Sequence, residues 1–195
     1  MNIVLSNINY TFKRGFLYVL LGPSGSGKST LLHIIAKLLP SNDGTIELDN
    51  YPIEPRDVML VLQQPFFYGD MTIGENIKVS HIFNKGITEK SALNYIETLQ
   101  IGHILKQKAN VCSGGEKARA NLVRGLVANK KVLLIDEPTA HLDSINSQTI
   151  ANLLYKECVE KMVIVTTHEK EYFSFPQTIY LFIEQGNLYE ITNPF

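Results

Sequence analysis

The segment Gly22–Thr30 has the residue types and the spacing of a phosphate-binding loop. It reads Gly-Pro-Ser-Gly-Ser-Gly-Lys-Ser-Thr, which fits the pattern G-x-x-x-x-G-K-[ST] without a gap. An apolar run at 16–21 precedes the loop, and a helix-like run at 31–39 follows it before Pro40. Glycines let successive backbone N–H groups turn toward phosphate oxygens at the start of such a helix. The segment therefore predicts a nucleoside triphosphate site, because chance would rarely frame a flexible Gly/Ser linker with a strand and a helix.

Two side chains of this loop are expected to have distinct roles. The Lys28 ammonium can reach the β- and γ-phosphates, and the Ser29 hydroxyl can bind Mg²⁺. The residues of the loop that we expect to bind the nucleotide are Gly22, Pro23, Ser24, Gly25, Ser26, Gly27, Lys28, Ser29 and Thr30.

Two adjacent carboxylates end a second apolar run, at 131–135. A parallel strand is buried on both faces, so this run predicts a strand with Asp136 and Glu137 at its C-terminal edge, where α/β proteins bind ligands. Asp136 suits Mg²⁺, usually through water. Glu137 can polarise a water aimed at the γ-phosphate. The alternative reading of the pair is an acidic loop start.

A strand-end histidine and a Ser-Gly-Gly turn complete the chemically suggestive residues. His168 follows the apolar run 162–166, and the same sheet edge would bring it beside Lys28 and Glu137. Ser113, Gly114 and Gly115 directly precede a predicted helix, so their free N–H groups and the helix dipole form a second anion site. Taken alone, that turn is also compatible with a simple helix cap.

The composition favours one cytosolic α/β protein. The 195 residues are 45% hydrophobic, enough for one sizeable core, and the net charge of −1 gives no basic field for nucleic acid. We see no signal peptide and no apolar run near the roughly 20 residues of a membrane span. Cys112 and Cys158 make neither a disulfide framework nor a zinc site.

Apolar runs alternate with amphipathic ones, which indicates a mainly parallel sheet with crossover helices. Between 65 and 112 we expect one helical stretch, 88–101, with Thr88 as its N-cap, and irregular pieces around 65–70. This segment resembles a mostly helical insert between two strands, and the alternative is an ordinary α/β crossover. Strands are expected at 16–21, 45–48, 58–62, 131–135, 162–166, 179–183 and 187–191, the last two joined by a tight Gly-Asn turn, and helices at 28–39, 88–100, 115–128 and 144–160.

In their order along the chain, these motifs resemble the ATP-binding cassette (ABC) ATPases, from about Leu5 to Tyr189. The glutamine loop corresponds to 61–65 with Gln63, the signature to Cys112–Glu116 and the D-loop to Ala140–Asp143. The resemblance implies a P-loop NTPase fold with a mainly parallel core sheet, flanking helices and a small antiparallel β portion. It also implies one domain, 1–195, in which 1–64 and 129–195 form the core and 65–128 a helical signature subdomain.

The resemblance further implies a head-to-tail dimer that encloses two ATP molecules. Ser113 and Gly115 of one subunit would meet the γ-phosphate held by the other, with Asp143 bridging the interface. By this reasoning the catalytic residues are Glu137, His168, Lys28 and Gln63, the Mg²⁺ ligands are Ser29, Gln63 and Asp136, and the signature side of the nucleotide site is Ser113, Gly114, Gly115 and Asp143.

The family reading makes the chain the ATPase subunit of a transporter, working with a separate membrane-spanning subunit and paired with a copy of itself or a paralogous cassette. It would lie in the cytoplasm, peripheral to the membrane. The segment 139–147 is similar to lipoprotein-releasing and macrolide-export cassettes. The alternative is a soluble cassette of translation, repair or chromosome handling, which a single cassette without heptads disfavours. A GTPase or small kinase is a third option, but 129–132 fails the guanine-reading pattern Asn-Lys-x-Asp.

Three positions depart from the family or extend it. Most members of the family begin one strand earlier and carry there an aromatic residue that stacks on adenine. That residue is missing here, because 5–15 already resembles the strand and turn that follow it. Tyr10 or Phe12 could replace it, but we favour neither and expect weak base selectivity. Cys112 replaces the usual leucine and is expected to pack as a small hydrophobe. The aromatic run 66–68 is either core packing or a surface for a membrane subunit.

Overall fold

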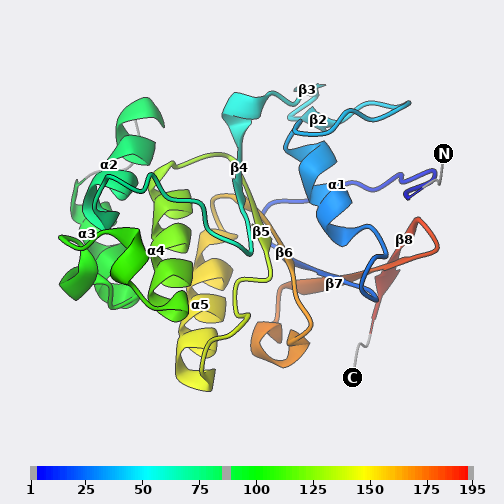
Figure 1. Cartoon of the computed structure of the whole chain (residues 1–195). Coiled ribbons are helices and arrows are strands. Elements are labelled where there is room, and N and C mark those ends of the chain that lie inside the picture. Colours follow the sequence, from blue (N-terminus) through cyan, green and yellow to red (C-terminus); the bar gives the residue numbers. More distant parts are fainter. Residues whose placement is uncertain (1–3, 85–88, 193–195) are drawn as a thin grey trace.

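A six-stranded sheet forms the centre of the protein, in the order β4-β5-β6-β1-β7-β8 (Figure 1). This computed structural model describes residues 4–84 and 89–192. Neighbouring strands are parallel except for β7 and β8, which form the predicted hairpin with Gln185 and Gly186 in left-handed turn conformations. The strands are β1 Leu17–Leu21, β4 Val58–Val61, β5 Val132–Asp136, β6 Met162–Thr166, β7 Thr178–Glu184 and β8 Asn187–Ile191.

Both faces of the sheet are covered, which explains why its central strands are apolar throughout. Helix α1 (Lys28–Ile35) packs on the face that carries Tyr18 and Leu134, whereas α4 (Gly114–Val127) and α5 (Ser144–Glu157) cover the face that carries Val19 and Ile135. Successive side chains of a strand point to opposite faces, so each strand contributes to both halves of the core. The predicted α/β class with a parallel sheet is confirmed.

Helix α1 ends four residues before its predicted end at 39. Ala36 is its C-cap, and Lys37 adopts a left-handed φ of 59°. The N–H groups of Leu38 and Leu39 then turn back to the carbonyl of His33, at 2.9 and 3.2 Å. This closure satisfies a carbonyl of the last turn before Pro40, so the apolar residues 38 and 39 extend beyond the helix and are exposed.

The helices expected from the sequence did not include α2, which occupies Ile73–Asn84. Its start is a capping box: the Thr72 N–H and hydroxyl donate to Glu75 Oε2 at 2.7 and 2.9 Å, and the Glu75 N–H donates to Thr72 Oγ1 at 3.2 Å. Helix α3 spans Glu89–Thr98, and the predicted N-cap Thr88 lies outside the described residues. In Figure 1, α2 and α3 lie beside α4, away from the sheet.

The strand that the resemblance implied within 5–15 is absent, although the turn at its end is present. Asn7 has a left-handed φ of 50°, which breaks an extended run, and Ser6 N–H makes a single backbone bond to Gly186 O at 2.7 Å. Gly15 forms the expected turn with φ 86°. The remaining short elements are β2 Glu47–Leu48 and β3 Tyr51–Pro52, an antiparallel pair, and the 3₁₀ turns Pro55–Asp57, Gly102–Ile104, Ala109–Val111 and Lys170–Phe173.

Candidate active site

A cleft of about 470 Å³ lies at the carboxyl ends of β1, β4, β5 and β6. Four segments reach this cleft: the phosphate loop, Gln63 shortly after β4, the end of β5 and the residues after β6. This position is expected for ligand sites on parallel sheets. Its lining residues are Ser24, Gly25, Lys28, Ser29, Gln63, Asp136, Glu137, Ala140, His141, His168 and Glu169. The structure thus brings together all the predicted catalytic and metal-binding residues.

The phosphate loop has the backbone that its glycines predict. Gly22, Gly25 and Gly27 have φ values of 148°, 78° and 106°, and a Cβ on Gly22 would lie 2.5 Å from the carbonyl oxygen of Ile183. Gly22 is therefore required both by its conformation and by the close approach of β7. Lys28 is buried, and its ammonium donates to the carbonyls of Gly22 at 2.8 Å and Pro23 at 3.2 Å, which places a positive charge in the cleft.

Thr166, at the end of β6, binds both the Asp136 carboxylate and the backbone of Glu137. Its buried hydroxyl donates to Asp136 Oδ1 at 2.5 Å and accepts from the Glu137 N–H at 3.0 Å. Glu137 itself has a left-handed φ of 49°, a conformation that is costly for a residue with a side chain. Sequence reasoning missed the role of Thr166. A polar residue in the otherwise apolar run 162–166 was the available signal.

Glu137 and His168 contact each other directly across the cleft. The His168 N–H donates to Glu137 Oε2 at 3.3 Å, and His168 Nε2 lies 3.4 Å from Glu137 Oε1. Burial raises the pKa of Glu137, while His168 and the positive charge of Lys28 oppose that rise. The arrangement is that of an oriented carboxylate with raised basicity, which suits the acceptance of a proton from water.

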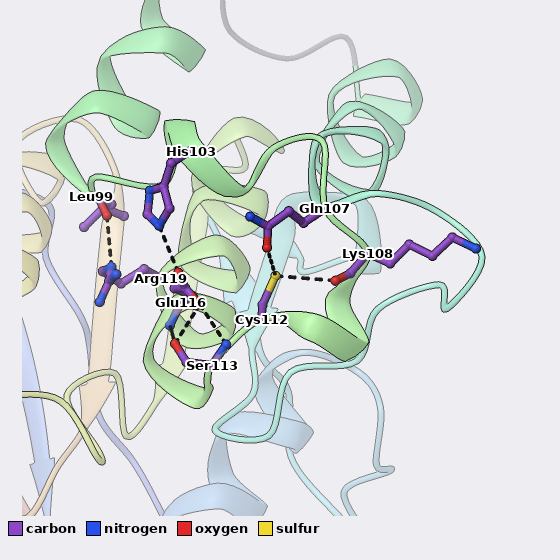
Figure 2. A network of polar contacts seen from close by, with 8 residues as sticks. All are labelled: Leu99, His103, Gln107, Lys108, Cys112, Ser113, Glu116 and Arg119. Carbon is purple, nitrogen blue, oxygen red and sulfur yellow. Dashed lines mark hydrogen bonds and ion pairs between the residues drawn. The ribbon is translucent and has the colours of Figure 1, made fainter.

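The predicted signature residues lie outside this cleft. Ser113 is the N-cap of α4 in a second capping box, in which its N–H and hydroxyl donate to Glu116 Oε2 at 2.7 and 2.8 Å (Figure 2). Asp143 is the N-cap of α5 and accepts from the Asn146 N–H at 2.9 Å. Ser113, Gly114, Gly115 and Asp143 are therefore not brought to Lys28 within one chain.

The aromatic residues considered for adenine stacking are used for packing. Tyr10, Phe12 and Tyr18 form edge-to-face pairs with ring centroids 4.9 to 6.1 Å apart, and the Tyr10 hydroxyl donates to Glu190 at 2.7 Å. Neither Tyr10 nor Phe12 lines the cleft. Cys112 is 6% exposed and packs in the core, which confirms its expected role.

The aromatic run after Gln63 divides between surface and core. Phe66 and Tyr68 are 70% and 51% exposed, and their ring centroids lie 6.0 Å apart. Phe67 instead packs against the core, with the Arg124 guanidinium carbon 4.8 Å from the centroid of the Phe67 ring. Two side chains of α4 fix this loop: Asn121 Nδ2 donates to Leu62 O at 3.0 Å, and Arg124 donates to Phe66 O. Sequence reasoning missed both, since only the fold brings α4 to this loop.

None of the helices in the described ranges 4–84 and 89–192 has the length and apolar character needed to cross a bilayer.

Comparison with known proteins agrees with this geometry. The family model described as ABC transporter matches residues 5–140. The glutamine transport ATP-binding protein GlnQ of Geobacillus stearothermophilus is 31% identical over 98% of this chain and 85% of its own length. The glutamate transport ATP-binding protein GluA of Corynebacterium glutamicum is 32% identical over 97% of this chain and 84% of its own length.

Solved structures show the same fold. The dimeric bacterial ABC transporter cassette MJ0796 superposes with a TM-score of 0.84 and 28% identity, covering 97% of this chain and 91% of its own. Its post-hydrolysis state bound to ADP and Pi, also dimeric, gives a TM-score of 0.82 over the same shares of the two chains. This chain belongs to the ABC transporter family and is the ATP-binding, ATP-hydrolysing cassette of such a transporter.

Proposed function

We propose that ATP is hydrolysed in the cleft at the carboxyl ends of the strands, with Glu137 as the group that positions and deprotonates the attacking water. The contact between Glu137 and His168, at the edge of the cleft that Lys28 also lines, carries this proposal. Lys28 and the loop N–H groups bind the phosphates, and His168 orients Glu137 and the γ-phosphate. Gln63 lies on the loop that α4 fixes, and it contacts the nucleotide site. When that site closes, Gln63 transmits the movement to the helical segment.

The cleft also fits Mg²⁺. Asp136, Ser29 and Gln63 offer carboxylate, hydroxyl and amide oxygens on its lining, and the Thr166 hydroxyl fixes the Asp136 carboxylate at 2.5 Å. The described residues hold no cluster of three or more His, Cys, Asp or Glu side chains suited to a metal, in keeping with an ion bound by few protein groups and by phosphates. When bound, Mg²⁺ would neutralise charge that develops on the phosphate oxygens.

The proposed active unit is a pair of cassettes. In one chain Ser113 caps α4 outside the cleft, yet its turn offers backbone N–H groups and a helix N-terminus, so it can meet a γ-phosphate only on another cassette. The dimeric state of MJ0796 supports this arrangement. Asp143, as the cap of α5, is proposed to lie at the same junction.

A membrane-spanning subunit is the proposed partner at the surface just after the glutamine loop. It would hold the cassette at the cytoplasmic face of the membrane. Phe66 and Tyr68 present an exposed aromatic pair there, on a loop that Arg124 anchors. Exposed aromatic residues of this kind are typical of interface anchors. The curated relatives are named as transport proteins, which does not favour the alternative of a soluble cassette for translation or repair.

Subunit complementation tests the composite site. A Lys28→Ala chain loses phosphate binding, and a Ser113→Arg chain blocks its signature turn, so each is expected to be inactive alone. Only a mixed dimer contains an intact site, one of its two, so mixing equal amounts should restore turnover to at most about half of the wild-type value. If mixing restores no turnover although mixed dimers form, the proposed arrangement is wrong.

A further inference from the structure

A polar network joins His103 to the signature serine. His103, in the 3₁₀ turn Gly102–Ile104, approaches Glu116 Oε1 with its Nε2 at 2.9 Å (Figure 2). The other carboxylate oxygen, Glu116 Oε2, accepts from the N–H and the hydroxyl of Ser113 at 2.7 and 2.8 Å. Glu116 therefore stands between His103 and Ser113, with one oxygen bound to each.

The segment that carries His103 is tied to α4 before the histidine and closed by a local contact after it. Arg119 Nε donates to Leu99 O at 3.0 Å before it, and Cys112 Sγ donates to Lys108 O at 3.5 Å after it (Figure 2). Ile104, next to His103, is fully buried. These contacts fix the backbone on which His103 stands, so its approach to Glu116 is built into the fold.

Glu116 is a charged group beside a turn that would receive a phosphate. The bonds from Ser113, followed by the one from His103, lower the pKa of Glu116 to about 2, so the side chain is a carboxylate at neutral pH. A carboxylate repels a γ-phosphate and competes with it for the Ser113 hydroxyl proton, because both are acceptors. A donor on the far oxygen of Glu116 weakens both effects.

We propose that His103 is a positioning residue of the composite ATP site: by donating to Glu116 Oε1 it weakens the hold of that carboxylate on the Ser113 hydroxyl and lets Ser113 donate to the γ-phosphate of the partner cassette. This assignment rests on the proposed pairing of cassettes. It goes beyond the family motifs, since His103 belongs to none of them. A plain surface ion pair would instead contribute only to the stability of the folded chain.

A double-mutant cycle separates these two roles. The measured quantity is the dissociation constant of the ATP-dependent dimer in chains that also carry Glu137→Gln, which slows hydrolysis. His103 is 61% exposed, so its loss should have the modest effect of an exposed pair: His103→Ala should raise the constant about two- to fivefold per site, and about four- to 25-fold for a dimer with two sites.

In the Glu116→Gln background the same change should have no effect. The glutamine oxygen keeps the capping box with Ser113, but the amide nitrogen then stands where His103 would donate and accepts no hydrogen bond. Lys106→Ala, which removes a charge from the same exposed segment, is the matched control and should leave the constant unchanged. The ATP affinity of the monomer should be similar in all these chains.

Two results would overturn the assignment, and they differ in what they mean. If His103→Ala changes the dissociation constant of the dimer equally in chains with Glu116 and in Glu116→Gln chains, or changes it in neither, then His103 does not act through Glu116. Absence of any ATP-dependent dimer in the Glu137→Gln chain would overturn the proposed pairing of cassettes and this assignment with it.

Discussion

His168 holds Glu137 through both its backbone and its side chain: the His168 N–H donates to Oε2 at 3.3 Å, and Nε2 lies 3.4 Å from Oε1. The strand β6 that precedes His168 is paired with β5, which ends at Asp136, so the sheet sets the distance between the two residues. The left-handed backbone of Glu137, at φ 49°, is a costly conformation that the surrounding contacts must hold in place. The sheet therefore places the two residues in contact at the edge of the cleft.

Glu137→Gln should lower ATP turnover by about 10²- to 10⁴-fold, the usual contribution of a general base. ATP binding should remain, since the phosphate loop is untouched. Steady-state turnover and a nucleotide-binding titration measure the two effects. Glu171→Gln, an exposed carboxylate in the turn after His168, is the matched control and should keep full turnover. Near-normal turnover of Glu137→Gln would remove Glu137 from the mechanism.

Thr166→Val should weaken both the fold and the Mg²⁺ site. The substitution keeps the shape but removes the bond to Asp136 and one acceptor of the Glu137 N–H, inside a fully buried environment. The free energy of unfolding should fall by about 1–3 kcal/mol, and half-maximal turnover should need more Mg²⁺. Denaturant titration and a Mg²⁺ series check this. Thr149→Val is the control: it removes a threonine hydroxyl that donates to Ile145 O at 2.8 Å within α5, and it should leave the Mg²⁺ requirement unchanged. An unchanged Mg²⁺ requirement in Thr166→Val would contradict the expectation.

Gly125→Ala should destabilise the chain even though alanine favours helices. A Cβ at 125 would lie 2.4 Å from Val61 Cγ2, where α4 packs on β4. Relieving that clash should cost about 1–3 kcal/mol, more than the roughly 1 kcal/mol gained in helix propensity. Gly114→Ala, with no atom within 4 Å of its added Cβ, should be tolerated by the fold. Equal melting temperatures for the two variants would show that α4 does not pack against Val61 at position 125 in this way.

The Glu116 capping box should make part of the stability sensitive to acid. The folded pKa of Glu116 lies at about 2, below its ordinary value of 4.5, so its contribution is present above that ordinary value and is lost as the pH falls toward 2. The difference in melting temperature between wild type and Glu116→Gln should therefore stay constant above about pH 5 and shrink toward about pH 2. Glu97→Gln, an exposed carboxylate of α3, serves as the charge control. A difference that persists undiminished at the acid end would contradict the expectation.

Local signals explain which parts of the fold the sequence predicted. The phosphate loop, the strand before Asp136 and the hairpin at Gly186 each combine several residues that restrict the backbone in the same way. Helix α2 was missed, although Thr72 and Glu75 have the spacing of a capping box that would have indicated its start. The N-terminal strand failed because the left-handed conformation of Asn7 is not visible in an apolar pattern.

The site was predictable only where a motif carries it. Lys28, Glu137 and His168 are far apart in the chain, but each follows a strand that ends at the same edge of the sheet. Thr166 and His103 belong to no motif, and their roles come from contacts across 30 and 13 residues of sequence. Such contacts depend on the register of strands and on the packing of α4, which a single sequence does not specify.

Sedimentation velocity of the Glu137→Gln chain with and without ATP tests the central claim, that two cassettes close one ATP site. The account predicts monomers without nucleotide, dimers with ATP, and monomers again with ATP when Ser113→Arg is added. Two results would contradict this claim: a Glu137→Gln chain that binds ATP yet stays monomeric at every concentration, or a dimer that still forms with ATP when Ser113→Arg is added.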